Sequence, residues 1–228
     1  MTANLKCTAA VEPLPHEIAG AISALAGPGV GVSVIRILEA QQLFADEFAF
    51  ILNASPARRK EFAAGRSSAR LALAALDGPA SPILRGEFYE PVWPSGFAGS
   101  ITHDGAFAAA LACRSTSGLC PYGLDIVDLH GRHASGFQEI AGAILTSKER
   151  AWVSAEKISI AEIFSFKEAA IKIISPKSRR FVDFKSIELN RIPASGGLLL
   201  KSGNDTMICG RTIILGTLLI SVARLLDE

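Results

Sequence analysis

The segment that most constrains the fold is an apolar stretch at residues 159–174 that carries polar side chains at regular intervals. At about 100° per residue, four polar positions fall on one narrow stripe, while isoleucine, phenylalanine and alanine cover most of the remaining circumference. The stripe consists of Glu162, Ser165, Glu168 and Lys172. This pattern predicts a mostly buried helix that ends at Ser175-Pro176. Lys167 lies off the stripe among apolar neighbours, so another group must meet its charge.

The charges on this helix have two interpretations. Glu168 and Lys172 can form an i,i+4 ion pair of purely structural value, or they can face a site. The same choice applies to a second predicted helix at about residues 56–77, which begins with Ser55 as N-cap and Pro56 at the first helical position. Its cations either form a solvated helix face or gather around a ligand. They are Arg58, Arg59, Lys60, Arg66 and Arg70.

Composition limits the class of protein. With 228 residues, 49% hydrophobic and 20% charged, the chain is predicted to fold as one large domain or two small ones. The net charge is only +1, so a local basic cluster favours a small polyanion over nucleic acid as the ligand. The four cysteines have no CxxC spacing, which indicates free thiols in a reducing compartment. The N-terminal region resembles neither an export signal nor a membrane span, so we expect a cytoplasmic protein with no membrane partner.

The order of the predicted elements indicates an α+β fold. Helices are expected at about residues 13–26, 56–77, 136–145 and 159–174, with one more beginning at the capping box Thr146 to Glu149. Strands are expected at 30–37, 106–113, 122–129, 181–192, 198–201 and 212–224, the last three as an antiparallel meander. Residues 99–105 are interpreted as a loop. The turn-rich link 115–121 divides the chain into two similar α/β halves, residues 1–117 and 118–228.

Three short motifs are weak singly but specific in combination. The first is Gly99-Ser-Ile-Thr-His103, and the second is Gly123-Leu-Asp125, in which Asp125 and Val127 share one strand face while Asp128 points to the other. The third is Phe164-Ser-Phe-Lys167-Glu168-xxx-Lys172. In this order the motifs resemble those of the 4′-phosphopantetheinyl transferases of the Sfp/EntD type. The resemblance covers roughly residues 56–172 and includes Arg58 to Phe62, Arg66-xxx-Arg70, Pro82 to Gly86 and Glu90 to Pro94.

The resemblance implies a fold and a reaction. The fold would consist of two pseudo-symmetric α/β lobes with the active site at their interface. The enzyme would move the 4′-phosphopantetheine arm of coenzyme A to a serine of an apo acyl or peptidyl carrier protein and release 3′,5′-ADP. Mg²⁺ would be required, with Mn²⁺ as a substitute. The pathway would be siderophore, polyketide or nonribosomal peptide assembly, and the protein would act as a monomer.

Site residues follow from the resemblance position by position. The nucleotide and its 3′-phosphate would be held by Arg58, Arg66 and Arg85, and the phosphates would also be met by Thr102 and His103. Lys167 and Lys172 would face the pyrophosphate. Asp125 and Glu168 would be the metal ligands, and Glu168, Lys172 and Asp125 the catalytic group, with Glu168 deprotonating the serine. The departure is Val127, where the family carries a second strand carboxylate. Mg²⁺ often binds one or two carboxylates plus phosphates and waters, so Asp125 with Glu168 can suffice.

Two rival interpretations remain. The chain could be a non-catalytic paralogue that binds coenzyme A or a carrier protein, with Val127 marking a degenerate metal site. Retention of both Asp125 and Glu168 argues against this rival. The motif match could also be chance, in a generic α+β domain whose charged helix is structural. Loss of all coenzyme A binding would be the signature of that second rival.

Overall fold

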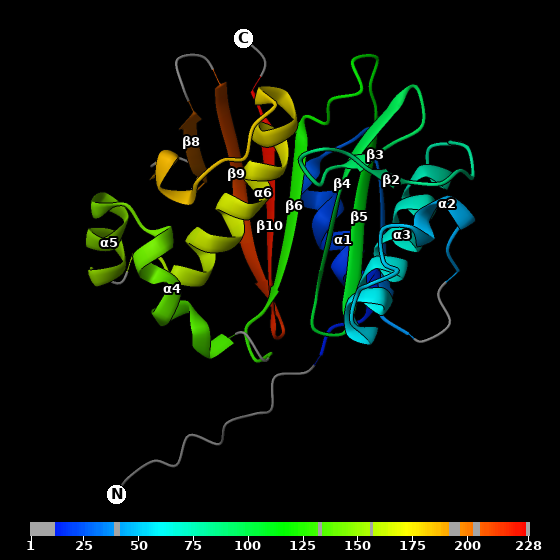
Figure 1. Ribbon diagram of the computed structural model, residues 1–228. Helices are drawn as coiled ribbons and strands as arrows, with labels where there is room; N and C mark the ends of the chain where they lie inside the picture. Colours follow the sequence, from blue (N-terminus) through cyan, green and yellow to red (C-terminus); the bar gives the residue numbers. More distant parts are fainter. Residues whose placement is uncertain are drawn as a thin grey trace, which may run out of the picture.

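Two antiparallel β-sheets meet edge to edge and form the middle layer of the molecule (Figure 1). The structure is a computed structural model that describes residues 12–38, 42–131, 134–155, 157–191, 197–202 and 206–226. The smaller sheet has the order β1-β5-β4 and the larger one β6-β10-β9-β8-β7, while β2 and β3 form a separate short pair. The strands are β1 (Val30–Arg36), β2 (Leu84–Arg85), β3 (Pro91–Val92), β4 (Phe97–Asp104), β5 (Phe107–Arg114), β6 (Tyr122–Asp128), β7 (Glu188–Arg191), β8 (Leu198–Ser202), β9 (Thr206–Leu215) and β10 (Leu218–Leu225).

Helices cover both faces of this layer. Helix α1 (Pro15–Ala26) lies behind it in Figure 1 and packs against β1 and β10, which belong to different sheets. On the other face, α3 (Pro56–Ala74) packs on the smaller sheet and α6 (Ile160–Ser178) on the larger one. The remaining helices are short: α2 (Ala45–Phe48), α4 (Phe137–Ile144), α5 (Ser147–Ser154) and the 3₁₀ turns Ala134–Gly136 and Phe184–Ser186. No helix in the described ranges has both the length and the apolar character needed to cross a bilayer.

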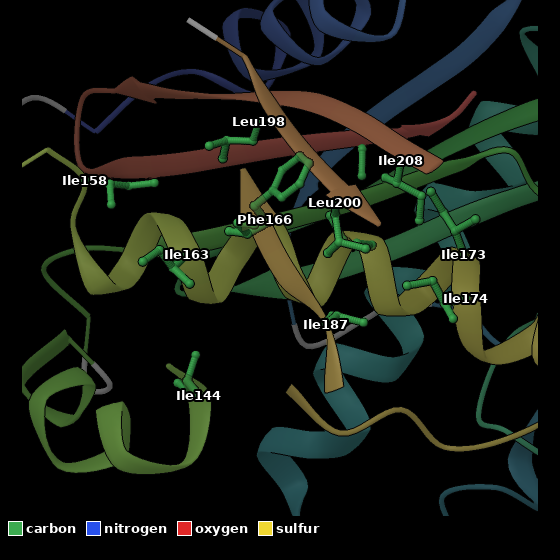
Figure 2. Packing of buried hydrophobic residues seen from close by; sticks show 14 of the residues in the cluster. Ile144, Ile158, Ile163, Phe166, Ile173, Ile174, Ile187, Leu198, Leu200 and Ile208 are labelled. Carbon is green, nitrogen blue, oxygen red and sulfur yellow. The ribbon is translucent and has the colours of Figure 1, made fainter. Parts of the chain in front are cut away.

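The predicted buried helix is α6. Figure 2 shows its apolar side chains, among them Ile163 and Phe166, packed against residues of β8 and β9 such as Leu200 and Ile208. Gly123 of β6 allows α6 to approach β6 closely, because a Cβ atom at position 123 would lie 1.8 Å from the carbonyl oxygen of Ala169. The glycine of the second motif therefore brings the charged stripe of α6 next to β6.

Four sequence-based expectations about the elements are wrong. Residues 99–105 are not a loop, because Phe97–Asp104 pairs with β5 as strand β4 and turns at Gly105, whose φ is +58°. Helix α6 does not stop before Pro176 but runs through it to Ser178, and the C-cap residue Arg179 adopts the left-handed conformation. A proline in the last turn costs only one backbone hydrogen bond, so the surrounding packing can retain it. The strand expected at 212–224 is a hairpin of β9 and β10, and the part of the expected strand 181–192 before β7 includes a 3₁₀ turn.

The two halves share a strand order. In each half the first strand pairs with the last strand of a hairpin, giving β1-β5-β4 and β6-β10-β9. One apolar cluster nevertheless spans both, because Ile22 of α1 contributes to the same core as Leu111 of β5 and Leu124 of β6. The expected α+β class is confirmed as a mixed helix and sheet fold, and the boundary at residues 117–118 stays a prediction.

Candidate active site

Three neighbouring cavities meet at His103, which lines all of them. The basic cavity, about 610 Å³, lies between α3 and the β2-β3 pair and includes Arg58, Arg66 and Arg85. The central cavity, about 520 Å³, includes Trp93, Asp125, Glu168 and Lys172, and Arg58 also borders it. The outer cavity, about 660 Å³, shares Asp125 and Glu168 and adds Val127, Phe137 and Phe164. The fold thus gathers cations and carboxylates from α3, α6, β2 and β6 around one histidine of β4.

Cations crowd the basic cavity. A guanidinium nitrogen of Arg58 contacts Nε2 of His103, and Nη2 of Arg66 donates to the carbonyl oxygen of Leu84 at 3.1 Å. Burial and the nearby Arg58 lower the pKa of His103 to about 4, so its imidazole is neutral at pH 7. Burial also lowers the pKa of Arg66 to about 10, which leaves it charged at pH 7. The buried Nε of Arg66 has no hydrogen-bond partner among the described residues, which suits an anionic ligand.

Only part of the basic cluster of α3 faces this cavity. Arg59 instead donates to the carbonyl oxygens of Leu52 and Ala54, at 2.7 and 3.0 Å. Arg70 forms an ion pair with the buried Glu47 at 2.8 Å. Arg85 of β2 does line the basic cavity, but it is exposed there and its Cζ lies 5.1 Å from the centroid of the Tyr89 ring. The structure therefore separates cations that face a cavity from those that stabilise local structure, a distinction that helical spacing does not make.

The acidic side of the site lies between β6 and α6. Nζ of Lys172 donates to Oδ1 of Asp125 at 2.9 Å and to the carbonyl oxygen of Leu124 at 2.7 Å. Lys172 thus pairs with Asp125 across the helix–strand interface, and the proposed ion pair with Glu168 is not the one that forms. Within the described ranges, Glu168 forms neither a hydrogen bond nor an ion pair. Burial raises the pKa of its carboxyl, Lys172 acts in the opposite direction, and Asp125 adds to the increase.

Lys167 does not reach the cavities. Its side chain is fully buried, and Nζ donates to Oε2 of Glu149 at 2.8 Å and to the carbonyl oxygens of Ile144 and Phe184 at 3.0 and 2.7 Å. The expectation that some group meets this charge is correct, and that group is Glu149 at the start of α5. The assignment of Lys167 as a cation facing a ligand phosphate conflicts with this position. All three donors of the ammonium group are already used in the core.

Thr102 and Val127 lie close to the carboxylates. The hydroxyl of Thr102 donates to Oδ1 of Asp125 at 3.1 Å. Val127 borders the outer cavity on the same strand face as Asp125, and it is buried in a small apolar cluster with Ala161 and Leu219. Leu124 and Ile126 instead belong to the apolar core that contains Ile22 of α1, so the strand alternation expected from the sequence is observed at these positions.

The donor atoms fit a hard divalent cation. Asp125 and Glu168 supply carboxylate oxygens, which Mg²⁺ prefers. In the described part of the chain, no group of three or more His, Cys, Asp or Glu side chains gathers to hold a metal ion. Two carboxylates with ligand phosphates and waters are a common Mg²⁺ set, so the residues present fit such an ion when a phosphate ligand is bound.

Sequence reasoning missed several contacts of the site. Glu61 lies 3.4 Å from Nη1 of Arg58 and 3.7 Å from Nδ1 of His103. The i,i+3 spacing from Arg58 was the available signal for this contact. Phe88, Tyr89 and Phe181 line the central cavity, and the ring of Phe181 contacts each of the other two at a centroid distance of 5.5 Å. No local pattern could join Phe181 to residues more than 90 positions earlier.

Comparisons with known proteins cover most of the chain. Residues 46–113 match a family model described as the 4′-phosphopantetheinyl transferase N-terminal domain, and residues 121–222 match that of the 4′-phosphopantetheinyl transferase superfamily. The chain is 32% identical over 173 residues to 4′-phosphopantetheinyl transferase Npt of Nocardia iowensis, covering 72% of this chain and 74% of that protein. It is 31% identical over 160 residues to 4′-phosphopantetheinyl transferase Svp of Streptomyces mobaraensis, covering 68% of this chain and 63% of Svp.

Two further similarities are weaker. Enterobactin synthase component D of Escherichia coli O157:H7 is 30% identical over 158 residues, which is 67% of this chain and 73% of that protein. A crystal structure of a holo-(acyl-carrier-protein) synthase from Bacillus anthracis, in complex with CoA (3′,5′-ADP), covers 47% of this chain and 96% of its own. Its TM-score is 0.39 at 22% sequence identity.

Proposed function

Because the chain belongs to the 4′-phosphopantetheinyl transferase superfamily, we propose that it transfers the 4′-phosphopantetheine arm of coenzyme A to a serine of an apo acyl or peptidyl carrier protein. One observation carries the proposal. A cavity with three arginines adjoins a pair of carboxylates, with His103 between them and Lys172 on the acidic side. Coenzyme A carries a 3′-phosphate and a pyrophosphate, so its binding and reaction require both the arginines and the carboxylates that would hold a metal ion.

The basic cavity would hold the nucleotide end of coenzyme A. Arg58 and Arg66 supply guanidinium groups suited to bidentate phosphate binding, and Arg85 stands at the rim. The neutral His103 offers one N–H donor without adding charge. The two halves that contribute these residues share one strand order, which supports the proposal that they are pseudo-symmetric lobes with the active site between them.

Asp125 and Glu168 would hold Mg²⁺. When bound, the ion would neutralise charge on the pyrophosphate during phosphoryl transfer. Lys172 is held beside Asp125 and would contact the same pyrophosphate, stabilising the charge that develops on the leaving 3′,5′-ADP. The aromatic wall of the central cavity, formed by Phe88, Tyr89 and Phe181, would accommodate the apolar part of the arm.

Glu168 would take the proton of the carrier serine, directly or through a water. The serine oxygen attacks the phosphorus that bears the arm, the bond from this phosphorus to the bridging pyrophosphate oxygen breaks, and 3′,5′-ADP leaves with the negative charge. Burial raises the pKa of the Glu168 carboxyl, which makes it a stronger base than an exposed glutamate. Its freedom from hydrogen bonds within the described ranges leaves it available for this role.

The direct test is incubation of the protein with coenzyme A, Mg²⁺ and a panel of apo-carrier domains, followed by intact-mass analysis. The proposal predicts a carrier heavier by one phosphopantetheine arm and the release of 3′,5′-ADP. Coenzyme A binding without modification of any carrier, at any Mg²⁺ or Mn²⁺ concentration, would favour the non-catalytic paralogue instead.

The cation arrangement predicts different effects for two adjacent arginines. Arg58→Gln should weaken the binding of coenzyme A roughly tenfold or more and that of dephospho-coenzyme A less, because a charge-assisted hydrogen bond to the 3′-phosphate is lost. Arg59→Gln is the matched control, since Arg59 bonds only to the chain's own carbonyls in the described ranges. Calorimetric titration with both ligands measures the difference. Equal losses for the two ligands in Arg58→Gln would contradict a 3′-phosphate site here.

The departure at Val127 gives a further prediction. Val127→Glu should lower the half-saturating Mg²⁺ concentration for transfer, because it adds a carboxylate on the strand face that carries Asp125. It should also lower the free energy of unfolding by about 1–3 kcal/mol, since Val127 is buried among apolar side chains.

Val127→Gln is the control for this substitution, because it has nearly the same size without the charge. A Mg²⁺ titration of carrier modification by native protein and both variants decides the matter. If all three show the same Mg²⁺ dependence, position 127 does not face the metal. Activity only in Val127→Glu would support the degenerate-site rival.

A further inference from the structure

Side chains of β4, rather than its backbone, join the two sheets. The outer edge of β6 presents three backbone N–H groups to β4, and each donates to a β4 side chain. The contacts run from Leu124 to Ser100 Oγ at 3.0 Å, from Ile126 to Thr102 Oγ1 at 3.3 Å and from Asp128 to Asp104 Oδ2 at 2.7 Å. We call Ser100, Thr102 and Asp104 the seam. Each contact spans the same 24 positions, so the seam fixes a single parallel register between two sheet edges.

The same strand also presents the site. Residues alternate along β4, so that Ser100, Thr102 and Asp104 lie toward β6 while Ile101 and His103 border the basic cavity. A slip of one residue between β4 and β6 would therefore displace His103 relative to Asp125. The seam holds the nucleotide side and the metal side of the site in register.

Thr102 differs from the other two seam residues. Its hydroxyl accepts from the Ile126 N–H and donates to Oδ1 of Asp125. A hydroxyl has one proton, so a Thr102 that donates to Asp125 cannot donate to a phosphate at the same time. Thr102 lines the central cavity and is 5% exposed, about as buried as Asp125 at 6%, so the use of its single proton is what distinguishes it. This geometry opposes the assignment of Thr102 as a phosphate contact.

Asp125 is restrained from two sides. Oδ1 accepts from both Thr102 and Lys172, whereas Oδ2 has no hydrogen bond among the described residues. We propose that Thr102 is a positioning residue that fixes the Asp125 carboxylate so that Oδ2 is left for the metal ion. The inference rests on the proposed function, because it assumes that Asp125 binds the metal.

Three variants test this role. Thr102→Val keeps the volume but removes donor and acceptor, Thr102→Ser restores the hydroxyl, and Ser100→Ala removes a seam contact that does not touch Asp125. The probe is Mn²⁺ with coenzyme A, followed by the paramagnetic resonance signal of free Mn²⁺. Thr102→Val should raise the half-saturating Mn²⁺ concentration roughly tenfold, as expected for one lost hydrogen bond to a charged group. Thr102→Ser and Ser100→Ala should stay within about twofold of the native protein by the same reasoning.

Kinetic measurements distinguish a positioning role of Thr102 from direct contact with a phosphate. In carrier modification, Thr102→Val should shift the Mg²⁺ dependence and leave the KM for coenzyme A nearly unchanged. A raised KM for coenzyme A with unchanged Mn²⁺ binding would make Thr102 a phosphate contact and overturn the inference. Equal effects of Thr102→Val and Ser100→Ala on Mn²⁺ binding would reduce Thr102 to a seam residue and overturn it too. If Thr102→Val does not fold, Thr102→Ala carries the same comparison.

The inference and the proposed function can fail separately. Mn²⁺ binding does not require a carrier protein, so the comparison of variants stands even if the native protein modifies no carrier. Conversely, normal transfer by the native protein with unaltered Mn²⁺ binding in Thr102→Val overturns the positioning role alone.

Discussion

Asp125→Asn and Glu168→Gln will each reduce carrier-protein modification by at least about a hundredfold at ordinary Mg²⁺ concentrations, the scale on which lost transition-state charge stabilisation acts. Both changes keep the size of the side chain and remove the charge that would hold the metal ion. The Glu168 variant also removes the base proposed for the serine proton. Rates of carrier modification at a series of Mg²⁺ concentrations measure the effect.

Asp128→Asn is the control for this prediction. Asp128 lies on β6 three residues after Asp125, but its carboxylate accepts from the backbone of His130 and lines none of the three cavities. It should retain near-native turnover. Near-native turnover in the Asp125 and Glu168 variants as well would show that the two carboxylates are not the metal site.

Lys167→Met is expected to lower the free energy of unfolding by about 3–5 kcal/mol, because it leaves the buried Glu149 without its cationic partner. Glu149 is fully buried and also accepts from the backbone N–H groups of Leu189 and Thr146, so its carboxylate cannot turn outward without losing these bonds. Urea denaturation measures the change. Lys167→Met with Glu149→Gln should recover part of the loss, since no buried charge then remains.

Two comparisons make this result specific. Lys148→Met removes an ion pair with Glu188 whose side chains are 44% and 46% exposed, and it should cost only about 0–1 kcal/mol. In the folded Lys167 variant, affinity for coenzyme A should match that of the native protein. A large loss of coenzyme A affinity with unchanged stability would restore Lys167 to the phosphate site and contradict its structural role.

Local sequence pattern alone predicts several helices and strands of this protein and the family to which it belongs. The period of the apolar residues predicts α6, and the capping box at Thr146 predicts the start of α5. Alternation in β6 predicts that Asp125 and Val127 lie on one face. These features depend on backbone periodicity and on side chains within four residues, which a sequence displays directly. The order of the three motifs was sufficient for the family, which the comparisons confirm.

Only the tertiary structure decided which charge meets which partner. Lys167 and Lys172 stand five residues apart on one helix, yet one enters the core to meet Glu149 and the other meets Asp125 on β6. The sequence predicts a loop at β4 because the polar residues of this strand accept hydrogen bonds from the edge of β6, a contact 24 positions away that has no local signature. Burial, which sets the pKa directions of His103 and Glu168, likewise arises from elements distant in sequence. Pairing and desolvation depend on packing in three dimensions, whereas periodicity reports only which face of an element is buried.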